Sequence, residues 1–126
     1  MPWSLENVLP CRQQLELESR LNALAVLDEA SGLAREIDDF LRGLAARDLS
    51  GRLMTRLISA FNDRLTIRII ELTARRHRMP RVSWCWLALG SEGRHEQTFV
   101  SDQDNGLVFS ATNRGRQTPC VSYFCR

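Results

Sequence analysis

The sequence predicts an α+β fold in which N-terminal helices pack on a short, incomplete sheet. Apolar residues repeat at helical spacing up to position 80, and two short apolar runs separated by a polar turn follow them. With 126 residues, the chain is long enough for one modest hydrophobic core. Its 44% hydrophobic and 25% charged residues are typical of a globular protein. We therefore expect a helical region at 1–80 and the start of a sheet domain at 81–110.

The first two helices are predicted by apolar stripes. Leu17, Leu21 and Leu24 follow helical spacing, and Ser31-Gly32 is expected to separate this helix from the next. The second helix carries an apolar face made of Leu33, Ile37, Phe40, Leu41 and Leu44.

The third helix is predicted to be the longest. Asp48 or Ser50 can cap its start, and Pro80 is expected to end it. Its apolar ridge consists of Leu53, Leu57, Phe61, Leu65, Ile69 and Leu72. Such a ridge serves either the protein's own core or a partner helix. We favour the core, because the stripe is wide and has no sustained heptad pattern.

The region after position 80 reads as strand, turn, short helix and strand. Trp84 to Leu89 is an apolar run that ends at Gly90-Ser91, and a second apolar run spans Leu107 to Phe109. Asp102 and Asp104 open this second run. Side chains two apart on a strand share a face, so the two carboxylates are expected to lie side by side.

Paired carboxylates suit hard divalent cations, which prefer oxygen ligands. Gly90 lets the backbone approach a ligand closely, and Ser91 begins a segment whose free amides can hold phosphate oxygens. The sequence has neither a P-loop nor a dinucleotide fingerprint at this turn. Together these residues indicate a nucleotide with Mg2+. The alternative is that Asp102 caps a turn and Asp104 is an exposed acid at a strand end.

These residues carry a family resemblance. The segment GSEGRHE at 90–96 followed by SDQD at 101–104 resembles the N-terminal nucleotidyltransferase domain of PII-protein uridylyltransferases, within the DNA polymerase beta-like superfamily. It is more similar still to bacterial nucleotidyltransferases that are often joined to CBS or cyclic-nucleotide-binding modules, through EQT at 96–98 and SDQDN at 101–105. Phe61-Asn62-Asp63 is also similar, so the resemblance spans about Leu33 to Phe109.

The resemblance implies roles for the motif residues. Asp102 and Asp104 would be the catalytic metal ligands for Mg2+, while Gly90 and Ser91 would bind the β and γ phosphates. Arg94 would contact the triphosphate or fix the loop.

Supporting roles fall to Glu96, which would orient Arg94 or the loop, and to Gln97, Asn105 and Gly106. The implied reaction is attack by an acceptor hydroxyl on the α phosphorus of a nucleoside triphosphate, in a signal-transduction context. A PII-like signalling protein, another protein, a small molecule or a nucleic-acid end is each open as the acceptor.

One departure from the resemblance concerns the end of the sequence. The superfamily supplies a third carboxylate from a later strand, but no Asp or Glu follows Asp104 here. We expect the similarity to stop after Ser110, with residues 111–126 forming an irregular tail, truncated or frame-shifted. On this interpretation the chain alone is inactive and its sheet has an exposed edge. The alternative function is a nucleotide-binding regulatory fragment or a helical interaction module.

Partners and location follow from composition. The net charge of +2 gives no indication of nucleic-acid binding. The four cysteines form no C-x-x-C pair and are expected to be buried or incidental thiols. The first ten residues are not expected to be a signal peptide, and no window approaches the ~20 apolar residues of a membrane span, so a cytoplasmic protein is expected. His77 and His95 are expected to be bystanders, and a homo-oligomer is compatible with the helical stripes.

Overall fold

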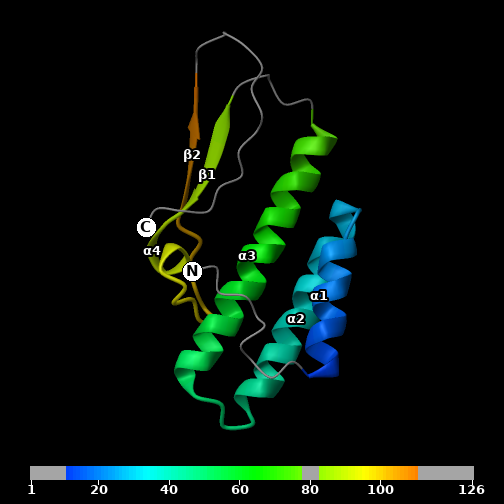
Figure 1. The fold of residues 1–126 in the computed structure, drawn as a ribbon, viewed down its shortest axis with the longest axis vertical. Helices are drawn as coiled ribbons and strands as arrows, with labels where there is room; N and C mark the ends of the chain where they lie inside the picture. Colours follow the sequence, from blue (N-terminus) through cyan, green and yellow to red (C-terminus); the bar gives the residue numbers. More distant parts are fainter. Residues whose placement is uncertain (1–10, 78–82, 111–126) are drawn as a thin grey trace.

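The structure is a computed structural model that describes residues 11–77 and 83–110. Three long helices lie side by side, and a two-stranded antiparallel sheet lies on the other side of the third of them (Figure 1). The predicted α+β class is confirmed. The expected tail at 111–126 and Pro80 lie outside the described residues.

Helices α1 (Arg12–Ala23) and α2 (Ala30–Ala45) are joined by a short 3-10 turn, η2 (Leu27–Glu29). Ser31 and Gly32 lie inside α2, so the prediction that they separate two helices is wrong. The break falls at residues 24–26, where Leu24 and Val26 leave helical backbone angles. Ser and Gly weaken a helix by only about 1 kcal/mol each. Burial of Ala30 and Leu33 in the core overrides that cost.

Helix α3 (Gly51–Arg76) begins at a side-chain cap. The hydroxyl of Ser50 accepts a hydrogen bond from the Leu53 amide at 3.3 Å, which confirms Ser50 as the cap. Asp48, the other candidate, instead takes a left-handed backbone conformation with φ of 63°. The helix ends at Arg76, before Pro80.

The apolar ridges of the three helices meet in one core. Leu57 and Phe61 of α3 are fully buried, and the Phe61 ring meets Phe40 of α2 edge-on at 6.2 Å between centroids. Edge-to-face aromatic pairs add to the stabilisation from buried area. The core consists of Leu17, Leu21, Leu24, Ala30, Leu33, Ile37, Phe40, Leu41, Met54, Leu57, Ile58, Phe61 and Leu72. The stripe therefore packs within the chain, as favoured above, and leaves little of α3 for a partner helix.

The sheet pairs β1 (Trp84–Ala88) with β2 (Asn105–Phe109), and the short helix α4 (Gly90–Gly93) follows β1. The predicted order of strand, turn, helix and strand is confirmed. Trp84 pairs with Phe109 and Ala88 with Asn105, so the hairpin ends where α4 begins. Asp102 and Asp104 precede β2, so the prediction that they lie on this strand is wrong. Beyond Ala88 the pairing continues through one hydrogen bond, from the Leu89 amide to the Asp104 carbonyl, because the chain turns into α4 at Gly90.

The two strands differ in burial. Trp84 and Ala88 of β1 are buried, whereas Leu107, Val108 and Phe109 of β2 are 51%, 55% and 62% exposed. Exposed apolar residues on a strand favour association with other chains. The expected tendency to self-associate stays a prediction.

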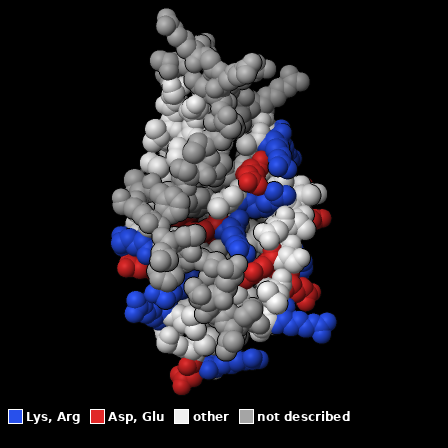
Figure 2. Space-filling view, in the orientation of Figure 1, with Lys and Arg blue, Asp and Glu red and all other residues white. Residues whose placement is uncertain are grey.

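Charges of both signs are interspersed on the face of the molecule that Figure 2 shows. Across the described residues, no helix is both long enough and apolar enough to span a membrane. Cys11 is an exposed thiol, and the Cys85 thiol donates to the Trp86 carbonyl at 3.6 Å; the other two cysteines lie outside the described residues.

Candidate functional site

The turn after β1 brings Gly90 against Asp104. Gly90 has φ of +56°, and a Cβ atom placed on it would lie 2.3 Å from Asp104 Oδ2. The Leu89 amide also donates to the Asp104 carbonyl at 2.8 Å. A side chain at position 90 would therefore displace the carboxylate. Two residues that the sequence predicted for one site, one at the turn and one before β2, are thus in contact.

Helix α4 is a single turn closed by backbone hydrogen bonds. The Gly93 amide donates to Leu89 and the Arg94 amide to Gly90, at 2.9 and 3.2 Å. The Glu96 amide donates to the carbonyl of Ser91 at 2.9 Å, which returns the chain toward the turn. Gly93 is needed for this compactness, because a Cβ atom there would lie 2.6 Å from the Ala88 carbonyl oxygen.

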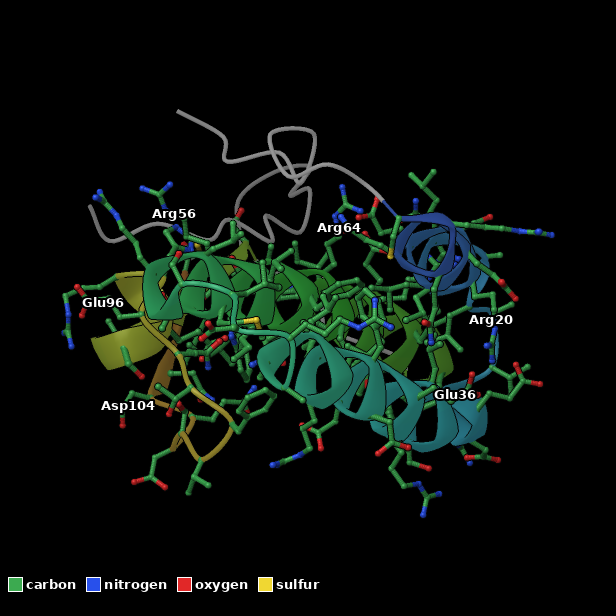
Figure 3. The ribbon with its side chains drawn as sticks, turned by 90° about the horizontal axis from the view of Figure 1, so that it is seen from below. Arg20, Glu36, Arg56, Arg64, Glu96 and Asp104 are labelled. Carbon is green, nitrogen blue, oxygen red and sulfur yellow. The ribbon has the colours of Figure 1, made fainter. Side chains whose placement is uncertain are left out.

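Arg94 and Glu96 form an ion pair on the surface beside α4. Arg94 Nε lies 2.9 Å from Glu96 Oε2, and both side chains are more than 60% exposed. Figure 3 places Glu96 and Asp104 at the same end of the molecule, opposite the Arg20–Glu36 pair that joins α1 and α2. The contact is the one expected if Glu96 orients Arg94, although their roles toward a nucleotide stay predictions.

Gln97 attaches the site loop to α3. Its side chain is 4% exposed, and its Oε1 accepts from Asn62 Nδ2 at 3.1 Å. Its amide donates to the hydroxyl of Ser59 at 3.2 Å. The sequence predicted a supporting role for Gln97 but missed Ser59 and Asn62. Asn62 belongs to the segment that resembles the family, which was the available signal.

Further contacts fix the loop between Gln97 and Asp104. The Thr98 amide donates to Ser101 Oγ at 2.8 Å, so the loop closes on itself. Gln103 Nε2 donates to Thr66 of α3 at 3.4 Å. The guanidinium of Arg42 lies over the Phe99 ring, 4.5 Å from its centroid, and ties the loop to α2.

The two predicted metal ligands, Asp102 and Asp104, are exposed, as is the predicted supporting residue Asn105 at the start of β2. Among residues 11–77 and 83–110, no ion pair involves Asp102 or Asp104. Over the same ranges, no three His, Cys, Asp or Glu side chains are arranged to hold a metal ion. The structure brings Asp104, and not Asp102, against the Gly90 turn.

A family model described as "Putative nucleotidyltransferase DUF294" matches residues 35–126. The chain belongs to this nucleotidyltransferase family. The matched range contains α3, β1, α4 and β2, and it continues past Phe109, where the similarity was expected to end. No curated protein and no solved structure matches the chain.

The candidate site also contains two acids to which the sequence analysis gave no role. Glu92 of α4 is 1% exposed, and neither of its carboxylate oxygens has a hydrogen-bond partner in the part of the chain that is described. In Asp63 of α3, one carboxylate oxygen, Oδ1, is buried without a hydrogen-bond partner in the described residues. The other, Oδ2, lies 3.3 Å from His95 Nδ1. His95, expected to be a bystander, thus has an acidic partner from a distant part of the sequence.

Burial acts on both acids, and like charge acts on Glu92. Burial raises the pKa of Asp63 to about 6. Burial, and then the charges of Asp63 and Asp104, raise the pKa of Glu92 above its usual value. Glu92 is therefore near enough to be repelled by both Asp63 and Asp104, although the three acids come from α4, α3 and the segment before β2. The one available signal was that Glu92 stands between Ser91 and Gly93 of the motif.

A cavity of about 360 Å³ lies elsewhere, between α1 and α2. Leu17, Phe40 and Leu44 are among its lining residues, and its lining includes none of the candidate site residues.

Proposed function

We propose that this nucleotidyltransferase transfers a nucleoside monophosphate from a nucleoside triphosphate to an acceptor hydroxyl, in the manner of PII-protein uridylyltransferases. The contact of Asp104 with Gly90 carries the proposal. It puts a carboxylate suited to a cation next to a turn suited to phosphates, and Mg-nucleotides require both together.

Mg2+ is the cation that the family resemblance implies, and the residues present fit it. Asp102 and Asp104 are exposed carboxylates outside any ion pair of the described residues. Mg2+ in nucleotide sites is commonly held by one or two carboxylates together with substrate phosphates. When bound, Mg2+ would neutralise negative charge on the triphosphate.

The protein's own groups would orient the triphosphate. The first amides of α4, beginning at Gly90 and Ser91, have no carbonyl partner within the helix and would donate to phosphate oxygens together with the Ser91 hydroxyl. Because Gly90 has no side chain, the Asp104 carboxylate lies directly beside its backbone. Arg94 would exchange its exposed pairing with Glu96 for charge-assisted hydrogen bonds to phosphate. Such an exposed pair contributes little to stability, so the exchange costs little.

We propose uridine triphosphate as the nucleotide and the hydroxyl of a PII-like signalling protein as the acceptor, in the cytoplasm. The support for this finer assignment is the resemblance of residues 90–104 to PII-protein uridylyltransferases.

Calorimetric titration with each nucleoside triphosphate and Mg2+ tests the proposal. An Asp102→Asn, Asp104→Asn double variant should bind at least tenfold more weakly than wild type. The matched control is an Asp28→Asn, Asp39→Asn double variant, which removes the same charge from exposed helical positions and should bind like wild type. Pyrophosphate release in the presence of a PII-like protein would then measure transfer. Equal affinity in the wild type and the first double variant would refute the proposed site.

A second candidate is a regulatory domain that binds nucleotide without transfer. It is favoured by one observation, that no three candidate ligand side chains in the described residues are arranged to hold a metal. Magnesium-dependent nucleotide binding without pyrophosphate release from any acceptor would identify this function.

A further inference from the structure

The buried carboxyl group of Glu92 has no partner that would explain its position. Glu92 lies in the single-turn helix α4, and both of its oxygens are inaccessible and without hydrogen bonds in the described part of the chain. Buried carboxylates without partners are destabilising, and their presence in a native structure commonly marks a site for an ion or for catalysis.

The surroundings of Glu92 contain a second orphaned acceptor and a third acid. Asp63 Oδ1, on α3, is also buried without a partner among the described residues. Asp104 lies against Gly90, and Gly90 is two positions before Glu92 in the chain. Burial raises the pKa of the Glu92 carboxyl, and the charges of Asp63 and Asp104 raise it further, so both acids act on it electrostatically. The ring of His95 contacts the other oxygen of Asp63 and leaves Oδ1 without a partner in the described residues.

We propose that Glu92 is a cation-binding carboxylate, which holds a hard divalent cation together with Asp104 at the nucleotide site. The inference rests on the proposed function, and it adds a ligand that neither the paired aspartates nor the Gly-Ser turn supplies. Two carboxylates suffice, because Mg2+ keeps several waters and takes further ligands from phosphates. A bound cation would also compensate the repulsion of Glu92 by Asp63 and Asp104.

Substitution of Glu92 by Gln separates this role from a structural one. Glu92→Gln keeps the shape of the side chain and removes its charge. Without metal, the variant should melt at a higher temperature than wild type, because a buried, repelled charge is gone. Its affinity for Mn2+, measured by electron paramagnetic resonance of free Mn2+, should fall at least tenfold. Added Mn2+ should therefore raise the melting temperature of this variant less than that of the wild type.

Glu29→Gln is the matched control. Glu29 is an exposed carboxylate of η2, outside the candidate site, so its loss should leave Mn2+ affinity and the Mn2+-induced shift unchanged. If Glu92→Gln does not fold, Glu92→Asp takes its place, since it keeps the charge but shortens the reach. It too should weaken Mn2+ binding at least tenfold.

Two results would overturn the inference. Wild-type Mn2+ affinity in the Glu92 variant, with loss of binding in the Asp102→Asn, Asp104→Asn variant, would leave the proposed function intact and remove Glu92 from the site. If the wild type does not bind Mn2+, with or without nucleoside triphosphate, both the role of Glu92 and the proposed function would be overturned.

Discussion

Asp104 occupies the space that any side chain at Gly90 would need, since a Cβ atom there would lie 2.3 Å from its Oδ2. Gly90→Ala should therefore displace the carboxylate and strain a backbone with φ of +56°. We expect a loss of about 1–2 kcal/mol in the free energy of unfolding. Mg-nucleotide affinity should fall as well. Urea denaturation and calorimetry would measure the two effects.

Gly32→Ala is the control for this substitution. Gly32 lies within α2, and nothing lies within 4 Å of a Cβ atom built there. Alanine should stabilise the helix by about 0.5–1 kcal/mol and leave nucleotide affinity unchanged. Wild-type affinity in Gly90→Ala would show that the close approach of Asp104 has no part in binding.

The hydrogen bond between Asn62 and Gln97 should control the order of the site loop. Asn62→Ala leaves the buried Oε1 of Gln97 without its donor, which should cost about 1–3 kcal/mol of stability. Amide hydrogen exchange in the 97–104 segment should accelerate more than exchange in α1. Thr66→Ala removes only the longer, exposed contact with Gln103 and should cost less than about 0.5 kcal/mol. Equal effects of the two substitutions would argue against Gln97 as the anchor.

The stacking of Arg42 on Phe99 should couple α2 to the loop. Arg42 also pairs with Asp38, so a single substitution would mix two interactions. A double-mutant cycle with Arg42→Gln and Phe99→Leu isolates the ring contact. We expect a coupling energy of about 0.5–1 kcal/mol from chemical denaturation. A coupling energy of zero would mean that the guanidinium and the ring are neighbours without mutual stabilisation.

The raised pKa of Asp63 predicts how the stability of the metal-free protein depends on pH. Its pKa rises from 3.8 to about 6 on folding, so the folded state binds more protons than the unfolded state between those values. Stability should therefore be greatest below about pH 4 as far as this group is concerned, and should fall as pH rises to 6. The expected loss is on the order of 1–2 kcal/mol after allowance for partial solvent exposure.

Asp63→Asn should flatten this part of the stability profile, measured by thermal denaturation at a series of pH values. Asp39→Asn, on an exposed position of α2, is the matched control and should preserve the slope. A stability that rises between pH 4 and 6 in the wild type and not in Asp63→Asn would mean that the contact with His95 outweighs burial.

The sequence was sufficient for features that depend on neighbouring residues. The Ser50 cap, the β1 strand, the Gly90 turn and the start of α4 all follow from residue types within a few positions. The proximity of Gly90 and Asp104 could also be predicted from the sequence. In an antiparallel pair of strands, the residue after the first strand lies beside the residue before the second.

The remaining features depend on packing between distant segments. The acidic neighbours of Glu92 come from α3 and from the segment before β2, so no local pattern shows that its carboxyl is buried beside them. Likewise Ser59 and Asn62 contact Gln97 only because α3 passes behind the site. The break between the first two helices was predicted at Ser31-Gly32, on their weak helix propensity, and not at residues 24–26. Burial of Ala30 and Leu33 outweighs that propensity and keeps Ser31-Gly32 inside α2.

Helix α3 faces the core on one side and the site loop on the other (Figure 1). Leu57, Ile58 and Phe61 are buried in the core, while Asn62 and the residues that contact the loop alternate with them. A surface helix usually leaves one face free to vary. Here saturation mutagenesis should find that substitutions are poorly tolerated at every position from 57 to 63. Natural sequence variation in this helix should be greater toward its C-terminal end.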